Sequence, residues 1–264
     1  MDKGIQTKYE SLLLFLREME KAAIAFSGGV DSTFLLAAAK EALGKNVLAL
    51  TIKTPYIPQW EIKEAIEITR NLNIAHKIIE LDIPDEIIYN PEDRCYLCKI
   101  KLFTQLKEEA RTQGIKHVLD GTNYDDLSDY RPGMKALKKL NIISPLLENK
   151  LGKNDIRSLS KNLELPTWNK PAYACLLTRL PYGTKISNED LSRIEKGEEI
   201  LMKMGFSGAR LRTHGELARI EINPNDFSRI TSSVRDELTL NLKNCGYKYI
   251  TLDLEGYKMG SFNK

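Results

Sequence analysis

The sequence predicts an α/β protein, in which a parallel sheet covered by helices is followed by a small α+β domain. In the first half of the chain, short apolar runs typical of strands alternate with segments of helical periodicity, and this alternation favours a parallel sheet with helices on both faces. From about residue 188 the order changes to helix, strand, helix and strand. A chain of 264 residues with 42% hydrophobic content can bury a sizeable core and is long enough for one large domain or for a large and a small one, as expected of a globular enzyme.

Helices separate the strands of the predicted sheet. An N-terminal helix is expected at roughly 7–19, and the helix after the first strand should end at Gly44. Ligands bind such sheets beyond the carboxyl ends of their strands, so the loops after Phe26, Ile52 and Asp120 should face one crevice. We expect strands at 21–27, 46–52, 76–82 and 116–122, and helices at 31–44, 59–72 and 96–112.

The last part of the chain forms the small α+β domain in this prediction. The boundary falls near 183–188, which divides the chain into domains of 1–185 and 186–264. The second domain is expected to bind a substrate or to build a homo-oligomer. Its expected elements are a helix at 188–205, a strand-like segment at 209–222, one long helix at 224–245 and a strand at 247–254.

Composition narrows the class of partner. The formal net charge of +3, from 39 basic and 36 acidic residues, is too small to indicate a nucleic-acid coat, whereas small anionic substrates fit it. The longest apolar stretches, such as "SLLLFL" at 11–16, are far shorter than a membrane span. We therefore expect a cytoplasmic protein that binds no membrane. In that reducing compartment metal binding, catalysis or burial is expected, rather than a disulfide framework, for Cys95, Cys98, Cys175 and Cys245.

The stretch "AFSGGVDST" at 25–33 joins an apolar strand to a helix. Two glycines let the backbone bend sharply and present its N–H groups to an anion, and the helix N-terminus adds partial positive charge. Asp31 is expected either to cap the helix or to hold a Mg²⁺ ion that bridges phosphates. The residues of this expected phosphate-binding loop, to which the family resemblance described next assigns ATP, are Ser27, Gly28, Gly29, Val30, Asp31, Ser32 and Thr33.

Ser-Gly-Gly-Val-Asp-Ser directly after the first strand of a parallel sheet resembles the PP-loop of the ATP pyrophosphatases. The resemblance implies the adenine nucleotide alpha hydrolase-like fold and cleavage of ATP to AMP and pyrophosphate. It differs from Walker A, which requires a lysine before its Ser/Thr. Adenylation turns a poor electrophile such as a carboxylate into an activated ester with AMP as its leaving group, and a nucleophile must then arrive.

Three of the cysteines lie in segments with functional character. Cys95 and Cys98, in "RCYLCK", start a predicted helix, where one turn brings both sulfurs to the same side. Such a pair can ligate zinc or an iron–sulfur cluster, or act as a redox pair. Cys175 lies in the Pro-rich loop "PTWNKPAYACLLTRLPYG" with cationic side chains nearby in sequence, which favours thiolate. Those cations are Lys170 and Arg179. The fourth cysteine, Cys245, lies at the end of a predicted helix and is expected to be inert.

The segments "RCYLCK", "GTNYDDLSDYRPG", "KPAYACLLTRLPYG", "RTHGELARIE" and "YITLDLEGYKMGS" together resemble the LarE-type sulfur transferases. The resemblance spans nearly the whole chain. It implies adenylation of a carboxylate of a pyridinium-3,5-dicarboxylate mononucleotide and insertion of sulfur there, in the biosynthesis of the nickel-pincer cofactor. In one subgroup a cysteine gives up its own sulfur and becomes dehydroalanine.

This chain has the single cysteine of that subgroup at Cys175 and adds Cys95 and Cys98. Three thiolates can hold a [4Fe–4S] cluster and leave one iron free. We expect this iron to bind a sulfide for transfer to the acyl-adenylate, as the similar three-cysteine arrangement of certain tRNA thiolases implies. The alternatives are structural zinc, completed by Cys245 or water, and a redox pair that assists a sacrificial Cys175.

Strand alternation places Arg210, Arg212 and His214 on one face of the second domain's sheet. A solvated sheet surface would explain them, but the family resemblance implies that Arg210 and Arg212 hold a substrate phosphate as bidentate donors. Glu221 is expected to contact the substrate or a metal. The resemblance also places adenine or ribose contacts in the loop after the fourth strand, at Gly121 and at the acids Asp125, Asp126 and Asp129, which could instead begin a helix.

The leading hypothesis is therefore an ATP-dependent sulfurtransferase that uses Mg²⁺, ATP and a [4Fe–4S] cluster, with Lys99 and Arg179 as candidates to stabilise developing negative charge. A tRNA thiolase would use the same chemistry, but it needs a broad basic surface. An ammonia-using synthetase would not require three cysteines. The alternative from another class is a non-catalytic, zinc-stabilised nucleotide-binding protein.

Overall fold

The computed structural model describes residues 3–128 and 133–258 and divides into two compact units. The first unit consists of Met1–Thr54, Gln59–Glu86 and Asp93–Lys170. The second consists of Pro171–Lys264 together with two short segments from the first half of the chain, Pro55–Pro58 and Ile87–Glu92. The division at 185/186, which rests on the change in element order near residue 188, stays a prediction.

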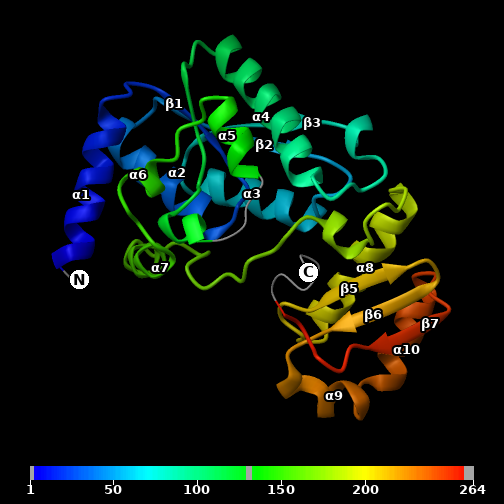
Figure 1. The fold of residues 1–264 in the computed structure, drawn as a ribbon. Coiled ribbons are helices and arrows are strands. Elements are labelled where there is room, and N and C mark those ends of the chain that lie inside the picture. Colours follow the sequence, from blue (N-terminus) through cyan, green and yellow to red (C-terminus); the bar gives the residue numbers. More distant parts are fainter. Residues whose placement is uncertain (1–2, 129–132, 259–264) are drawn as a thin grey trace. The chain divides into compact units, whose positions relative to one another are not determined.

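The first unit is built on a parallel sheet, as predicted (Figure 1). The strand order β3-β2-β1-β4 places β1 in the interior, paired in parallel with both β2 and β4. A parallel bridge from Leu119 to Ile143 continues the sheet beyond β4. The strands are β1 (Ala22–Ala25), β2 (Val47–Lys53), β3 (Ala75–Glu80) and β4 (His117–Leu119).

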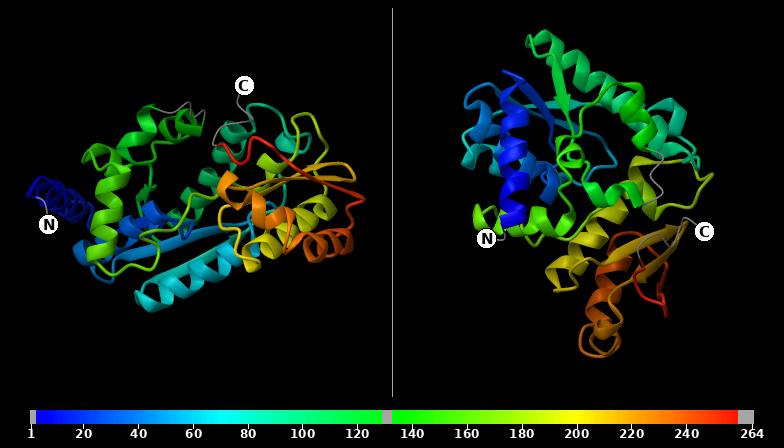
Figure 2. Two further views of the ribbon diagram at one scale, coloured as in Figure 1. Left: turned by 90° about the horizontal axis from the view of Figure 1, so that it is seen from below. Right: turned by 60° about the vertical axis from the view of Figure 1, so that its left-hand side comes forward.

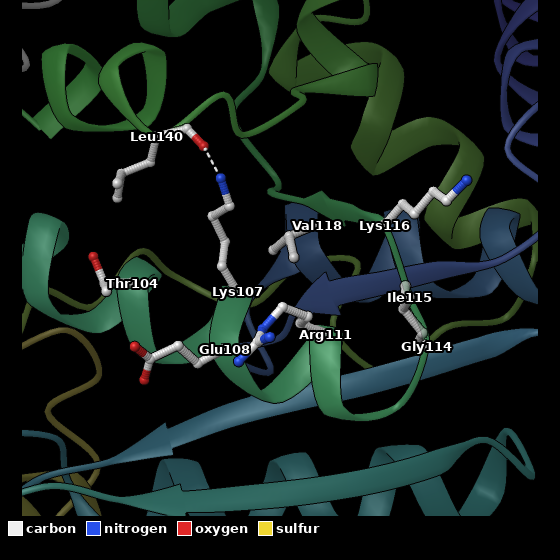
Figure 3. Close-up of a pocket in the computed structure, with 9 residues that line it drawn as sticks. All are labelled: Thr104, Lys107, Glu108, Arg111, Gly114, Ile115, Lys116, Val118 and Leu140. Carbon is white, nitrogen blue, oxygen red and sulfur yellow. Dashed lines mark hydrogen bonds between the residues drawn. The ribbon is translucent and has the colours of Figure 1, made fainter.

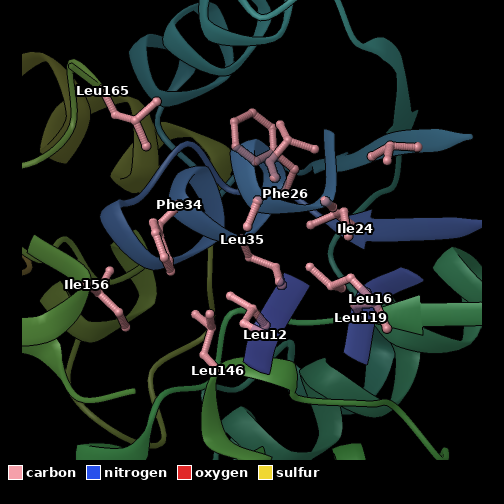
Figure 4. Packing of buried hydrophobic residues seen from close by; sticks show 14 of the residues in the cluster. Leu12, Leu16, Ile24, Phe26, Phe34, Leu35, Leu119, Leu146, Ile156 and Leu165 are labelled. Carbon is pink, nitrogen blue, oxygen red and sulfur yellow. The ribbon is translucent and has the colours of Figure 1, made fainter. Parts of the chain in front are cut away.

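Helices cover both faces of this sheet. Alternate residues of β1 therefore belong to two different cores. Ala22 and Ile24 belong to a core formed with α1, α2, α3 and α7, some of whose side chains are drawn in Figure 4. Ala23 belongs to a second core with α4. Each fully buried leucine in these cores stabilises the fold by about 1.5–3 kcal/mol. The helices are α1 (Lys3–Arg17), α2 (Val30–Leu43), α3 (Gln59–Asn71), α4 (Arg94–Thr112), α5 (Gly133–Lys139), α6 (Pro145–Glu148) and α7 (Lys153–Asn162), with the 3₁₀ turns η1 (Asp85–Ile87) and η2 (Tyr124–Ser128).

The N-terminal helix α1 lies at the edge of the first unit in the left view of Figure 2. Its apolar stripe, which includes Leu12 and Leu16, is fully buried in the core shared with α2. The helix α2 ends where predicted, because Gly44 adopts a left-handed φ of 62° and its N–H bonds to the carbonyl of Lys40. Among the described residues, no helix has the length and apolar character that crossing a membrane requires.

The second unit contains a three-stranded sheet in the order β5-β6-β7. Strands β5 and β6 form an antiparallel hairpin in which Arg210 pairs with Glu221, and β7 runs parallel to β6. Leu211, Ala218 and Ile220 point into a core that also contains residues of the helices. The elements are η3 (Leu176–Arg179), α8 (Asn188–Lys203), β5 (Arg210–His214), β6 (Leu217–Glu221), η4 (Pro224–Asp226), α9 (Phe227–Thr231), α10 (Arg235–Asn244) and β7 (Tyr249–Leu252).

The prediction of one long helix at 224–245 is wrong, because the segment is broken into η4, α9 and α10. The break falls at Ser232–Val234. Ser232 has a non-helical φ of −118° and ψ of −88°, and its hydroxyl donates to the carbonyl of Ser228 at 2.5 Å. Such local serine bonds compete with the helical pattern of backbone hydrogen bonds, and the β-branched Val234 adds to the break.

Candidate nucleotide and thiol sites

The loop between β1 and α2 has the geometry of an anion cradle. Gly28 lies in the left-handed region with φ of 69°, which favours glycine, and Gly29 is the N-cap of α2 in an extended conformation. The amides that follow open the helix, and so the partial positive charge of its N-terminus faces the loop. The sequence-predicted residues Ser27 to Thr33 are therefore brought together at the carboxyl end of β1.

Hydroxyl groups hold this loop in shape. Oγ of Ser27 and Oγ of Ser32 lie 3.1 Å apart, and Ser32 donates to the carbonyl of Gly29 at 3.2 Å. The side chain of Thr33 is fully buried, and its Oγ1 has no hydrogen-bond partner among the described residues. The loop is thus organised before any ligand binds, which lowers the cost of binding an anion.

Gly121 lies against the start of α2. A Cβ atom at this position would come within 3.0 Å of the Ser32 nitrogen and 3.2 Å of its Cα. The carboxylate of the preceding Asp120 is buried and accepts hydrogen bonds at 2.5 Å from Thr122 and from Ser144. The loop after β4 is therefore fixed directly against the phosphate loop, and any side chain at residue 121 would push the two apart.

Lys153 belongs to this site although the sequence did not point to it. Its Nζ lies 2.5 Å from Oδ2 of Asp31, and its backbone N–H donates to Oδ2 of Asp125 at 2.7 Å. Lys153 is the first residue of α7. A lysine there opposes the helix dipole, and this mismatch is the one signal in the sequence that could have indicated a second role.

Lys170 also holds the phosphate loop, through a hydrogen bond to its backbone. Its ammonium donates to the carbonyl of Gly28 at 3.0 Å and pairs with Glu64 at 2.5 Å. Arg157 holds the same segment by donating to the carbonyls of Trp168 and Lys170 at 2.8 Å each. The predicted influence of Lys170 on the Cys175 thiol stays a prediction.

The acids of the loop after β4 serve as local hydrogen-bond acceptors. Oδ2 of Asp126 accepts the N–H of Asn123 at 3.0 Å, and Asp125 accepts that of Lys153. Both residues lie in the turn η2. Asp129 is outside the described residues. The adenine or ribose contacts expected at this loop stay a prediction.

Cys95 and Cys98 lie in the first turns of α4, three positions apart and therefore on one side of the helix. Cys95 is exposed and Cys98 is partly exposed, and none of the four cysteines forms a disulfide. Two accessible thiols on one helix face suit a soft metal or an iron–sulfur cluster in donor chemistry. Within residues 3–128 and 133–258, no group of three or more His, Cys, Asp or Glu side chains is placed to hold a metal ion.

Cys175, in the second unit, stands at the head of the turn η3 as its N-cap. The N–H of Leu176 donates to the carbonyl of Tyr56 at 2.9 Å, and the N–H of Thr178 donates to that of Cys175 at 3.2 Å. Arg179 donates to the carbonyls of Ala174 and Cys175 at 3.1 Å and 3.4 Å. The backbone around the thiol is therefore held on both sides.

Arg179 is a buried cation next to this cysteine. The two carboxylate oxygens of Glu198 accept hydrogen bonds from Nε of Arg179 at 2.7 Å and from its Nη2 at 3.0 Å. Burial disfavours the charge, but the carboxylate of Glu198 and the nearby Cys175 outweigh it and raise the pKa of Arg179. The guanidinium stays charged and lies beside the Cys175 loop, and its role in stabilising developing negative charge stays a prediction.

Arg210 and Arg212 are buried, so the alternative of a solvated sheet surface is wrong for them. Arg212 forms a two-pronged pair with Glu221, with two N–O distances of 2.9 Å, and also donates to the carbonyl of Thr178. Arg210 donates to the carbonyl of Ala172 at 2.7 Å, and burial lowers its pKa. Both arginines thus hold the backbone that flanks Cys175, and their role in binding a substrate phosphate stays a prediction.

Cys245 lies apart from this chemistry. It packs against the apolar core of the second unit, and burial raises the pKa of its thiol. A thiol with a raised pKa is a poor nucleophile and a poor metal ligand at neutral pH. Its environment fits the inert role expected for it.

A pocket of about 570 Å³ lies elsewhere in the first unit, between α4 and the start of β4 (Figure 3). The cations Lys107, Arg111 and Lys116 line it together with apolar side chains that include Val118. Gly114 to Lys116 precede β4, and so this pocket is at the amino end of the strand. Ligands of parallel sheets bind at the carboxyl ends, where the phosphate loop is found, so the pocket is not part of the nucleotide site.

Comparison with known proteins agrees with this geometry. Residues 21–91, which include the phosphate loop, match the family of the queuosine biosynthesis protein QueC. The chain is 40% identical to an uncharacterised protein of Synechocystis sp. over 98% of both chains, and 39% identical to one of Methanocaldococcus jannaschii over 90% of this chain and 91% of the relative.

It is also 33% identical to the pyridinium-3,5-bisthiocarboxylic acid mononucleotide synthase of Lactiplantibacillus plantarum, over 98% of this chain and 95% of that enzyme. The similarity covers both the phosphate loop and the Cys175 segment. The chain belongs to the LarE-type family of ATP-dependent sulfur transferases, within the PP-loop ATP pyrophosphatases.

Proposed function

We propose that this protein uses ATP to adenylate a carboxylate of a small nucleotide and then places sulfur on the activated carbon. The favoured acceptor is pyridinium-3,5-dicarboxylate mononucleotide, because the full-length relative from Lactiplantibacillus plantarum is named as the synthase of the corresponding bisthiocarboxylic acid. The observation that carries the proposal is Cys175 at the head of η3 beside the buried cation Arg179, because an adenylating enzyme that uses another nucleophile has no need of this arrangement.

In the first step, an oxygen of the substrate carboxylate attacks the α-phosphorus of ATP, and the bond to pyrophosphate breaks. The N–H groups of the phosphate loop and the hydroxyls of Ser27, Ser32 and Thr33 are the donors for the departing oxygens. Asp31 would hold Mg²⁺, which prefers oxygen ligands and offsets phosphate charge when bound. Lys153, which pairs with Asp31 at 2.5 Å, brings its ammonium to the same place.

In the second step, a sulfur nucleophile attacks the acyl carbon, and AMP leaves with the electrons of the carbon–oxygen bond. Cys95, Cys98 and Cys175 would hold a [4Fe–4S] cluster; their thiolates suit this group. When bound, a three-thiolate cluster supplies an iron that carries sulfide without loss of a protein sulfur. Arg179 keeps positive charge near the Cys175 loop, and Arg210 and Arg212 are the donors for the substrate phosphate.

The proposal is tested by incubating the reconstituted protein anaerobically with ATP, Mg²⁺, sulfide and the pyridinium dicarboxylate mononucleotide. AMP and pyrophosphate should form only when the nucleotide is present, and mass spectrometry should show oxygen replaced by sulfur in the acceptor. An unfractionated tRNA sample in place of the nucleotide serves as the comparison. Thiolation of tRNA alone would assign the protein to another acceptor, and ATP binding without pyrophosphate release would contradict an enzymatic role.

A further inference from the structure

Asn90 joins two segments of the second unit that are far apart in the sequence. It is fully buried, and its Nδ2 donates to the carbonyls of Leu177 at 3.3 Å, Leu180 at 3.0 Å and Pro181 at 3.0 Å. An amide nitrogen carries two hydrogens, so one of them is shared between two acceptors. All three carbonyls belong to the turn η3, headed by Cys175, or to the residues just after it.

The backbone reinforces this connection. The N–H of Gly183 donates to the carbonyl of Asn90 at 3.2 Å, and the N–H of Ile186 donates to that of Ile88 at 2.8 Å. The segment Ile87–Glu92 therefore runs along the chain that leaves η3 and belongs to the same compact unit. Along the sequence, this segment leads directly into Cys95 and Cys98.

The residue type fits the requirement at this position. Asn90 has φ of 48°, in the left-handed region, which asparagine and glycine tolerate and most residues do not. Its Oδ1 is buried and accepts no hydrogen bond from any described residue, so donation is what the side chain contributes. Glycine would keep the backbone and lose the donors, and aspartate would place an acceptor against three carbonyls.

We propose that Asn90 is a positioning residue for Cys175. By holding the carbonyls at the end of η3, its amide keeps the turn closed, and the closed turn keeps the thiol at its head and Arg179 alongside. Only the step from thiol position to sulfur transfer depends on the proposed function. The position of the turn itself is a property of the folded chain and is measurable without any ligand.

The test compares Asn90→Gly with Asn73→Gly, a matched change at another asparagine, whose φ is 51°. Hydrogen exchange should become faster in a peptide spanning residues 176–186 for Asn90→Gly and stay unchanged for Asn73→Gly. Sulfur transfer by the reconstituted protein should fall roughly tenfold or more in Asn90→Gly, since small displacements of a reacting group are costly. Acyl-adenylate formation, trapped with hydroxylamine, should stay within about twofold, because the phosphate loop is untouched.

This split separates positioning from general loss of stability, which would reduce both steps together. If Asn90→Gly fails to fold, Asn90→Asp, which also tolerates this φ but offers no donor to the three carbonyls, should show the same split. Unchanged exchange in 176–186, or equal loss of adenylation and sulfur transfer, would overturn the inference. If Cys175→Ala keeps full sulfur transfer, the proposed function fails instead, and the exchange result still decides the role of Asn90.

Discussion

Lys153 and Asp31 are 122 residues apart in the sequence, yet Nζ of Lys153 lies 2.5 Å from Oδ2 of Asp31 at the start of α2. Both side chains are partly exposed, and so the ion pair itself adds little to stability. The position of the pair is what matters, because a cation and a carboxylate meet where the phosphates of ATP are expected. We expect that, when a nucleotide binds, a phosphate replaces Asp31 as the partner of Lys153 and Mg²⁺ replaces Lys153 as the partner of Asp31.

Replacing Lys153 with Met should therefore impair adenylation. We expect kcat/KM for pyrophosphate release to fall roughly a hundredfold, the usual loss when one charged donor at a developing anion is removed. The control is Lys8→Met in α1. It removes an ion pair of 2.6 Å with Asp155, which lies on the same helix as Lys153. Lys8→Met should leave the rate unchanged, and equal rates for both variants would remove Lys153 from the site.

Gly121→Ala should weaken ATP binding, because the new Cβ would lie 3.0 Å from the Ser32 nitrogen and displace the start of α2. We expect the KM for ATP to rise about tenfold. Gly114→Asn is the comparison: nothing lies within 4 Å of a Cβ there, and asparagine tolerates the φ of 66°. Steady-state kinetics checks both, and a normal KM in Gly121→Ala would contradict the close approach.

Glu198→Gln should destabilise the second unit, because it leaves the buried guanidinium of Arg179 without its counter-charge. Both side chains are at least nine-tenths buried, and the loss should be roughly 3–5 kcal/mol in the free energy of unfolding. The neighbouring Glu199→Gln removes an exposed pair with Lys203 and should cost less than about 1 kcal/mol. Chemical denaturation distinguishes the two, and similar values would mean that burial of the pair is not decisive.

His76 should make stability depend on pH. Its Nε2 lies 2.8 Å from Oγ1 of Thr51, which in turn donates to the carbonyl of Phe26 at 2.7 Å. Burial lowers the pKa of His76 below the ordinary 6.5. The unfolded chain then binds the proton first, so the free energy of unfolding should fall as pH drops below about 6.5 and be unaffected by this group above it.

His76→Gln should remove that part of the dependence. Denaturation curves of both proteins at several pH values between neutral and about 5 measure it. Because Thr51 also holds the residue just before the phosphate loop, weaker ATP binding at low pH should accompany the loss in the wild type. Identical slopes in the two proteins would show that His76 does not set the dependence.

The sequence predicted the parallel sheet and most helix limits because alternating apolar runs and a terminal glycine such as Gly44 are local signals. It failed at 224–245, where Ser232 ends a helix through a hydrogen bond that only the folded backbone reveals. Lys153 and Asn90 were missed for a related reason. Each acts on a segment distant in sequence, and periodicity carries no information about such pairs.

In the candidate site, too, local features were predicted from the sequence and features that depend on the folded chain were not. The phosphate loop was readable because glycine, serine and aspartate occur together in one short stretch. Arg210 and Arg212 were correctly placed on one strand face, opposite Leu211, but their burial was not foreseen, because strand alternation cannot tell a covered polar face from a solvated one.

The measurement that tests the central claim most directly is anaerobic reconstitution with iron and sulfide, followed by metal analysis and absorbance spectra. We predict about four irons per wild-type chain, lost in Cys95→Ala, Cys98→Ala and Cys175→Ala and retained in Cys245→Ala. A colourless protein that holds one zinc, or iron that survives the loss of Cys175, would contradict the three-cysteine cluster and favour a structural metal or a sacrificial cysteine.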